Sequence, residues 1–544
     1  MRNRLPSLAA GLLCVAVAVG TSSTFLPHQS LWGDETTQLA GISLGPSRVV
    51  PWLAGRPEPG LNAIEDRMPP LSYWLGWAWS RAFTPAERPM RWLGVAAVGL
   101  SALLVHGAAR RVWGPWAGLA AGLVFATSPN VVIQAVEIRA YPLLILATSA
   151  MLAALVRLGA AGVGGEAGPG ARPPVGDLWA IVGLGVAATY LHFFGLVCCG
   201  GCMLAALILG PRRGLKTGAT LAAIAVVGAC CVGLLPFVSA SLGTAAGPAP
   251  AVEPLKAQLV DAARLLYRLV AHASTSVHKP SLVAAALGLG LSMVAAMAPK
   301  RRGAGAATGL AIALGSGYAV VVAARLVQSK FAATNPSYNA WMLPALSMLL
   351  ASGVAARSRP IRAAAGVGVG LLIAANLAAD LQLARRGDYF AHSPAHAVVS
   401  TVHRLGDGRA TVVMDGQPGP MSLLGYGIYY DLGRSIPQLI HRRGDGSRLG
   451  LFGRVDAPEV GLDGVATPYL IVVDADNQGA DVVAAQARAD AVAPRPDGPV
   501  ARLAAASGRW AKVEERALPG FVRADVDVFE RVGRPPSSPG PSSP

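Results

Sequence analysis

Two acidic residues stand side by side shortly after the first apolar segment of the chain, in the run Trp32-Gly33-Asp34-Glu35. A carboxylate within hydrogen-bonding reach of a hydroxyl can accept its proton, so the pair could act as a general base. Adjacent carboxylates can also hold a divalent cation, and two solvated acids would give the same pattern. The residue types alone therefore leave catalysis, metal binding and simple solvation open.

The same polar stretch later holds a second charged motif. Asp66 and Arg67 precede Met68 and the double proline Pro69-Pro70, after which the sequence becomes rich in aromatic residues. Proline favours the first turn of a helix, so we expect a helix to begin here and to lie along the membrane. Interfacial anchoring is a sufficient explanation of this motif by itself.

Two more features flank later apolar segments. Glu137 and Arg139 come just before Tyr141, where the fourth apolar segment begins, and His192 lies among aromatic residues where the fifth ends. An arginine near the bilayer surface can snorkel or pair with a neighbouring acid, and a single histidine is often only hydrogen-bonded. Each feature taken alone therefore has a structural explanation.

The elements that must position these residues are membrane-spanning helices. The chain has 544 residues, of which 53% are hydrophobic and 14% charged, with a mean hydropathy of +0.46. That composition excludes an ordinary soluble protein. A span needs about 20 apolar residues. We expect about eleven spans, at residues 8–25, 92–109, 112–129, 140–156, 178–191, 194–209, 219–238, 282–298, 306–327, 341–354 and 363–381.

The net charge of +16 would suit a nucleic-acid partner, but its distribution points to a bilayer instead. Basic residues cluster in alternate short loops, which is the positive-inside pattern. We expect the N-terminus in the cytoplasm, and residues 25–92, residues 240–281 and everything after 381 outside, in a plasma or inner membrane. Cleavage of residues 8–25 as a signal peptide is the alternative, and it leaves the remaining topology unchanged. The clusters are Arg2 and Arg4; Arg110 and Arg111; Arg157 and Arg172; Arg212, Arg213 and Lys216; Lys300, Arg301 and Arg302; and Arg357, Arg359 and Arg362.

The composition changes after residue 381, where the apolar segments stop. A small extracytoplasmic α/β domain is predicted there from helical and strand-like patterns. We therefore expect a membrane domain at 1–381 with a first outer loop at 26–91, an α/β domain at 382–533, and a disordered Pro/Ser tail at 534–544. The patterns are helices at 394–405 and 480–491 and strands at 410–414, 470–474 and 521–528.

All six cysteines fall inside predicted spans, so no disulfide framework is implied. The spacing Cys199-x-x-Cys202 could suggest a redox or zinc motif, but small residues that pack between helices explain it better. An amphipathic pattern over residues 253–273 predicts a helix on the outer surface of the membrane.

In order and spacing, these polar motifs resemble the C-type membrane glycosyltransferases that use polyprenyl-phosphate sugars. This superfamily includes the protein O-mannosyltransferases and the bacterial lipid A aminoarabinose transferases. The shared order is an acid pair after the first span, a double proline in the same loop, an arginine and tyrosine opening the fourth span, and a histidine with aromatic residues closing the fifth. The resemblance covers roughly residues 31–381, and the α/β domain is similar to one that many bacterial members carry.

The resemblance implies a mannosyltransferase-like enzyme that inverts the anomeric centre in one displacement. Asp34 is implied as the catalytic base, with Glu35 shaping the site, and Arg139 and then Arg67 as the groups that bind the donor phosphate. The partners implied are a polyprenyl-phosphate-linked sugar and a protein, glycolipid or polysaccharide acceptor, with no metal and no other cofactor. Further pocket residues are Asp66, Glu137, Tyr141, His192, Lys330 and Tyr338.

Two departures from the family pattern are visible. Met68 stands directly before the double proline, where the family often has a basic residue or histidine, and Arg67 is one position earlier. The late segment 337–344 lacks the arginine that usually precedes its tyrosine, and Lys330 is the nearest substitute.

Two other classes of function stay open. A lipid or sugar transporter would need charged residues in the middle of spans and an internal repeat, and neither is evident. A non-catalytic member of the same fold that binds lipid-linked sugar would explain the missing late arginine. The richness in Ala, Gly and Arg suggests a bacterial source, but neither the donor sugar nor the acceptor can be deduced from these residues.

Overall fold

The fold is described from a computed structural model of the chain. It describes residues 5–27, 29–58, 61, 66–160, 174–244, 254–271, 283, 290, 303–327, 334–385, 394–406, 408–416, 424–425, 427–428, 432, 438–441, 448–451, 460–477, 496–518 and 522–533. These residues form two compact units. The first, here called the membrane unit, takes Met1–Leu26, Gly41–Glu58 and Glu65–Ala384; the second, the α/β unit, takes Pro27–Ala40, Pro59–Ile64 and Arg385–Pro544.

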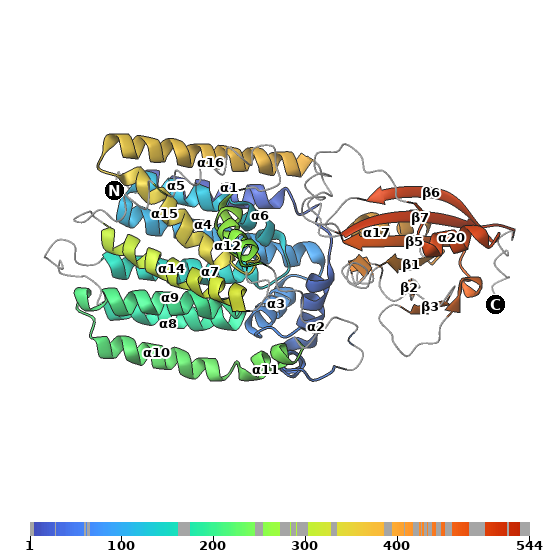
Figure 1. Cartoon of the computed structure of the whole chain (residues 1–544), viewed down its shortest axis with the longest axis horizontal. Coiled ribbons are helices and arrows are strands. Elements are labelled where there is room, and N and C mark those ends of the chain that lie inside the picture. The colour runs from blue at the N-terminus through green and yellow to red at the C-terminus, as the bar shows by residue number, and fades with distance from the viewer. Residues whose placement is uncertain are drawn as a thin grey trace. The chain divides into compact units, whose positions relative to one another are not determined.

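Every secondary-structure element that the structure describes in the membrane unit is a helix (Figure 1). Ten of the eleven predicted spans coincide with helices; of the remaining one, residues 282–298, the structure describes only Val283 and Gly290. The helices are α1 (Leu5–Ser23), α4 (Glu87–Trp113), α5 (Pro115–Ala126), α7 (Tyr141–Ala160), α8 (Pro174–Leu191), α9 (Phe194–Leu209), α10 (Thr217–Val232), α14 (Ala304–Val327), α15 (Leu343–Ser352) and α16 (Arg359–Arg385).

Four of these helices, α4, α7, α14 and α16, are long and apolar enough to cross a membrane on their own. Two further pairs pass the same test together but bend by 57° at a short break: α5 with α6 (Pro129–Val136), and α10 with α11 (Leu235–Thr244). The remaining predicted spans in the described part of the chain are shorter apolar helices. The total of eleven spans therefore stays a prediction.

Helix α7 is the central element of the membrane unit. It packs against α4, α8, α9, α14 and α15, and 78% of its apolar window is buried, compared with 33% for the peripheral α16 (Figure 1). Small residues make such close packing feasible. For example, a Cβ added to Gly201 of α9 would lie 2.5 Å from the carbonyl oxygen of Ala313 in α14. The residue that opens α7, Tyr141, is therefore held by a rigid scaffold.

Shorter elements connect these helices. Helix α2 (Gly33–Leu53) belongs partly to each unit and is kinked at Gly45, whose φ of 75° is a conformation that glycine tolerates best. Helix α3 (Leu71–Ala82) starts directly after Pro70, as the double proline predicts. Helix α12 (Leu255–Val270) confirms the amphipathic helix predicted over 253–273.

The α/β unit contains a seven-stranded mixed sheet in the order β4-β3-β2-β1-β5-β7-β6 (Figure 1). The central strands β2, β1 and β5 are parallel, and the other pairs are antiparallel. Alternate side chains of each strand face opposite sides, so Val412 and Met414 pack against α17 (Ala395–Leu405) while Val413 packs against α20 (Pro499–Ala506). The strands are β1 (Ala410–Gly416), β2 (Gln438–His441), β3 (Arg448–Leu451), β4 (Val460–Gly461), β5 (Tyr469–Asn477), β6 (Trp510–Leu518) and β7 (Val522–Arg531).

The predicted α/β character of the region after residue 381 is thus confirmed, including the strands at 410–414, 470–474 and 521–528. The predicted helix at 480–491 and the predicted disordered tail at 534–544 lie outside the described residues. The six cysteines are described, and none of them forms a disulfide.

Candidate active site

Arg139 belongs to the membrane unit and lies in the turn between helices α6 and α7. Helix α6 ends at Val136, and Glu137 adopts an extended conformation, so the chain turns before α7 begins at Tyr141. The buried Arg91 of α4 holds this end of α6, because its guanidinium donates to the carbonyl oxygen of Val136. Glu137 is buried beside the turn, and the side chain of Arg139 is only 9% exposed.

A charged guanidinium so deeply buried must be compensated, and Asp66 supplies the compensation. Arg139 Nη1 lies 3.4 Å from Asp66 Oδ2, and the hydroxyl of Tyr73 in α3 donates to the same oxygen. The other carboxylate oxygen, Oδ1, accepts the backbone N–H of Arg67 at 2.8 Å. Asp66, predicted only as a pocket residue, therefore joins the first outer loop, α3 and the start of α7.

The side chain of Arg67 forms hydrogen bonds within the protein, and its phosphate-binding role stays a prediction. Its Nη1 donates to the backbone oxygens of Trp52 at 3.4 Å and Asp66 at 3.0 Å. These bonds tie the loop to α2. Of the two predicted phosphate-binding arginines, Arg139 is the one that stands at the head of the central helix.

Three predicted pocket residues from distant parts of the sequence form one aromatic cluster. The ring of His192 lies 5.3 Å from that of Tyr141 and 5.8 Å from that of Tyr338, and the two tyrosine rings are 6.0 Å apart. Phe194, which sequence analysis did not select, stacks on Tyr338 at 5.8 Å. Tyrosine offers an apolar ring with a polar tip, and such a wall suits a sugar that has both apolar faces and hydroxyls.

The turn between α8 and α9 carries His192 into this cluster. His192 Nδ1 accepts the backbone N–H of Phe194 at 3.2 Å, which fixes the ring. Burial lowers the pKa of His192, and the positive charge of Arg139 lowers it further. The imidazole is therefore neutral at physiological pH, and it acts as a hydrogen-bonding wall rather than as a cation.

Polar residues of α6 bring Tyr338 to the site. Asn130 donates to the carbonyl oxygen of Pro336 at 2.8 Å, and Gln134 donates to Ser337 Oγ at 2.9 Å. The two residues are one helical turn apart, so they present a single polar stripe on an otherwise apolar helix. That stripe was a signal available in the sequence, because polar side chains within apolar segments generally have a specific partner. Sequence analysis missed Asn130, Gln134, Tyr73 and Arg91.

The predicted catalytic pair is in the other unit. Asp34 and Glu35 occupy the first turn of α2, where the helix dipole favours negative charge, and Glu35 is fully buried while Asp34 is half-buried. Their segment packs with the α/β unit, since Ser30 Oγ accepts the backbone N–H of His396 at 3.2 Å. The acid pair thus belongs to the α/β unit, and Asp66 and Arg139 belong to the membrane unit.

Lys330, the proposed substitute for the late arginine, lies outside the described residues. Arg325 is a basic residue close to Lys330 in the sequence, and the structure describes it in the last turn of α14. It is 6% exposed. Its Nε lies 3.8 Å from Asp261 of α12, and the same carboxylate oxygen accepts the hydroxyl of Thr334 at 2.6 Å. Asp261, Arg325, Lys256 and Arg264 line a cavity of about 660 Å³ beside α12.

One group of carboxylates in the described chain has the spacing of a metal site. Oxygens of Asp497, Glu515 and Asp527 in the α/β unit lie within 4.8 Å of one another. An ammonium group stands among them: Lys512 Nζ is 2.5, 3.6 and 3.0 Å from these three residues in that order. Burial alone would lower the pKa of Lys512, but its bonds to Asp497 and Asp527 outweigh burial and raise the pKa. The lysine charge therefore offsets part of the charge of the acids and occupies the position among them where a metal ion would lie.

No protein-family model and no curated protein matches the sequence, but solved structures match the fold. ArnT from Cupriavidus metallidurans bound to undecaprenyl phosphate superimposes with a TM-score of 0.52 at 14% identity, over 95% of this chain and 97% of ArnT. The apo form of ArnT gives 0.51 at 14% identity over the same shares. The Archaeoglobus fulgidus oligosaccharyltransferase tethered with an acceptor peptide gives 0.47 at 12% identity, over 79% of this chain and 63% of that one. The likeness to ArnT, at this identity, concerns the fold alone: the chain has an ArnT-like membrane fold, which agrees with the fold that the order of its motifs predicts.

Proposed function

We propose that this protein transfers a sugar from a polyprenyl-phosphate donor to a hydroxyl group of an acceptor on the outer face of the membrane. The observation that carries the proposal is the buried Arg139, which is positioned by Asp66 and lies next to the cluster of Tyr141, His192 and Tyr338. A phosphate-sized anion and a sugar ring have complementary partners there. The ArnT structure with undecaprenyl phosphate makes a polyprenyl phosphate the natural candidate for the lipid.

In the proposed reaction the acceptor oxygen attacks the anomeric carbon of the sugar. A new carbon–oxygen bond forms while the bond to the phosphate oxygen breaks, and its electron pair leaves with the polyprenyl phosphate. Asp34 takes the proton of the acceptor hydroxyl, and Glu35 shapes the surroundings of Asp34. A single displacement of this kind inverts the anomeric centre.

Arg139 stabilises the negative charge that grows on the leaving phosphate. Guanidinium suits this task because it stays charged at any relevant pH and matches phosphate geometry. Its burial strengthens the interaction, since charges interact more strongly away from water. The reaction needs no metal under this proposal, because the lipid phosphate is already a good leaving group.

The test uses membranes that carry wild-type or Asp34→Asn protein, incubated with radiolabelled polyprenyl-phosphate sugars such as mannose and arabinose. General-base catalysis typically contributes a factor of about 10² to 10⁴, so label transfer should fall at least a hundredfold in the variant. Asp463→Asn is a matched control, because this exposed acid of the α/β unit pairs only with the exposed Arg509 among described residues. A fully active Asp34→Asn enzyme would refute the mechanism.

The same assay separates the two competing functions. A non-catalytic protein that binds lipid-linked sugar would retain labelled donor without forming product. A transporter or flippase would move the donor across reconstituted vesicles without cleaving it. Product that appears only with wild-type and Asp463→Asn protein would support the glycosyltransferase and identify its donor.

A further inference from the structure

A second cavity in the membrane unit lies far from the candidate active site. It has a volume of about 250 Å³ and sits where α4 passes into α5, close to the residues that follow α15. Helix α4 has 27 residues, which corresponds to a length of about 40 Å. Arg91 lies near the opposite end of this helix, beside the turn of Arg139. The cavity lining consists of Arg110, Arg111, Val112, Trp113, Gly114, Ala355 and Arg357.

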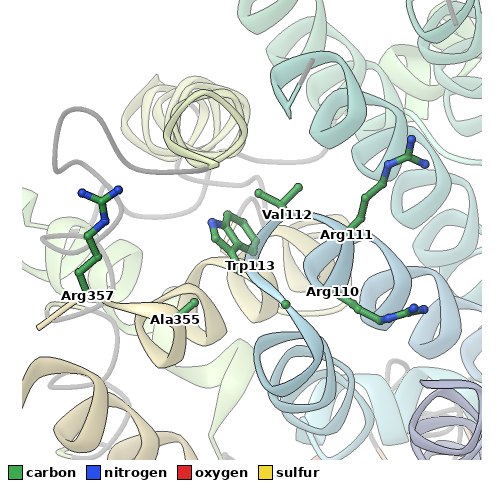
Figure 2. A pocket seen from close by; sticks show the side chains of 7 residues that line it. Arg110, Arg111, Val112, Trp113, Ala355 and Arg357 are labelled. Carbon is green, nitrogen blue, oxygen red and sulfur yellow. The ribbon is translucent and has the colours of Figure 1, made fainter. Parts of the chain in front are cut away.

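The lining combines three positive charges with no acid. Trp113 lies between Arg357 and the Arg110–Arg111 pair in Figure 2. All three arginines are exposed, and none forms an ion pair with any residue in the described ranges. Arg157, by contrast, pairs with Asp177 at 2.7 Å. Three uncompensated guanidinium groups around one hollow create a strong preference for an anion.

Trp113 adds a hydrogen-bond donor beside the three arginines. Trp113 lines the hollow and is 8% exposed. Its indole N–H donates to no residue that the structure describes. The indole nitrogen is not one of the buried atoms that lack a partner, so its N–H is not enclosed by protein. An oxygen of a ligand in the cavity could accept this N–H, and a phosphate offers several acceptor oxygens together with the negative charge that the arginines require.

We infer that this cavity binds the phosphate headgroup of an anionic phospholipid. The position favours a lipid over a soluble anion, because the cavity lies at the ends of helices α4 and α5 with the 73% exposed Trp116 next to it in sequence. Exposed tryptophan at a helix end is typical of the membrane interface. The basic loops predict this end to be cytoplasmic, which is the leaflet where anionic lipids attract clustered arginines.

The positive-inside pattern alone does not account for this site. Arg212 and Lys216 lie in another loop that the same pattern predicts to be cytoplasmic, and they are exposed in the same way. Neither residue lines this cavity or has a buried indole beside it. They therefore provide a matched control that removes an equal positive charge from the same predicted side.

The experiment measures lipid binding to the purified full-length protein by native mass spectrometry, with phosphatidylglycerol and phosphatidylcholine titrated separately. Wild type should retain one phosphatidylglycerol molecule more tightly than phosphatidylcholine. Each basic residue near an anionic lipid surface contributes a factor of about five. The Arg111→Gln/Arg357→Gln variant should therefore bind phosphatidylglycerol about thirtyfold more weakly, and Arg212→Gln/Lys216→Gln should bind it like wild type.

Two further arms identify the ligand and the site. Arg139→Ala should keep the phosphatidylglycerol affinity, because Arg139 lies near the opposite end of α4 from the cavity. Excess inorganic phosphate should fail to displace the lipid. Equal losses in the two double variants would overturn the inference, because they would indicate a general effect of surface charge. Unchanged binding in Arg111→Gln/Arg357→Gln would overturn it as well, and displacement by inorganic phosphate would replace the lipid with a soluble anion.

Discussion

Replacing Asp66 with asparagine tests whether Arg139 works only when a carboxylate positions it. The substitution preserves the size of the side chain but removes the negative charge that compensates the buried guanidinium. The carboxylate accepts from Tyr73, from the backbone N–H of Arg67 at 2.8 Å and from Arg139 at 3.4 Å. An asparagine can accept with only one of its two terminal atoms, so its amide N–H₂ must face a donor.

The magnitude follows from these contacts. A hydrogen bond to a charged group contributes about 1.5–3 kcal/mol. The 3.4 Å separation from Arg139 is long for such a bond, which places the loss at the lower end, about 1.5–2 kcal/mol. This corresponds to a fall in kcat/KM of roughly tenfold to thirtyfold. Because Asp66 positions Arg139, the group proposed to contact the donor phosphate, the KM for the donor should rise together with the fall in kcat.

The assay is the initial rate of label transfer at varied donor concentration, with the unfolding temperature measured in parallel. Glu58→Gln is the control, since it removes a carboxylate of the same outer loop whose partner Arg48 is 60% exposed. Asp66→Glu restores the charge and should recover part of the activity. Asp66→Asn kinetics equal to those of Glu58→Gln would refute the positioning role, and a loss explained by unfolding would appear in the thermal measurement.

Three further outcomes are expected. Gly195→Ala should lower both the unfolding temperature and the transfer rate. A Cβ at this position would lie 2.1 Å from the carbonyl oxygen of Ala188 and would disturb the turn that carries His192. Gly200→Ala in α9 is the control, because a Cβ there would meet open space. Burial lowers the pKa of His192 in the folded protein, whereas in the unfolded chain this histidine has a pKa of about 6.5. Below that pH the unfolded chain binds one more proton than the folded protein, so the unfolding temperature should fall from pH 7 towards pH 5. The fall should be less steep in His192→Gln. Lys512→Met should destabilise the α/β unit by about 2 kcal/mol, because it leaves clustered carboxylates without their cation. The free energy of unfolding is measured by denaturant unfolding. A stability equal to that of the Arg509→Met variant would contradict this reasoning.

The helices of the membrane unit could be predicted from the sequence because a bilayer enforces a simple rule. Every backbone group must be paired within the segment, so long apolar runs such as α4 and α7 have no alternative to helix. The α/β unit was also predictable, because apolar and polar residues alternate along strands such as β7, whose side chains face two different hydrophobic cores. The second half of a broken span was less visible: the 57° bend between α5 and α6 falls at Ser128-Pro129, where the predicted span 112–129 ends, and helix α6 beyond it was not predicted.

The sequence by itself indicated which residues could carry chemistry, because charge in an apolar chain is costly and is retained where it has a task. It thereby selected Asp34, Asp66, Arg139, His192 and Tyr338. It could not determine their partners, since a contact such as that of Tyr141 with Tyr338 depends on how helices pack across the bundle, and packing depends on the combined shape of many side chains. Only the tertiary structure decided that Asp66 compensates Arg139, that Arg67 turns to backbone oxygens, and that the acid pair of α2 packs with the α/β unit.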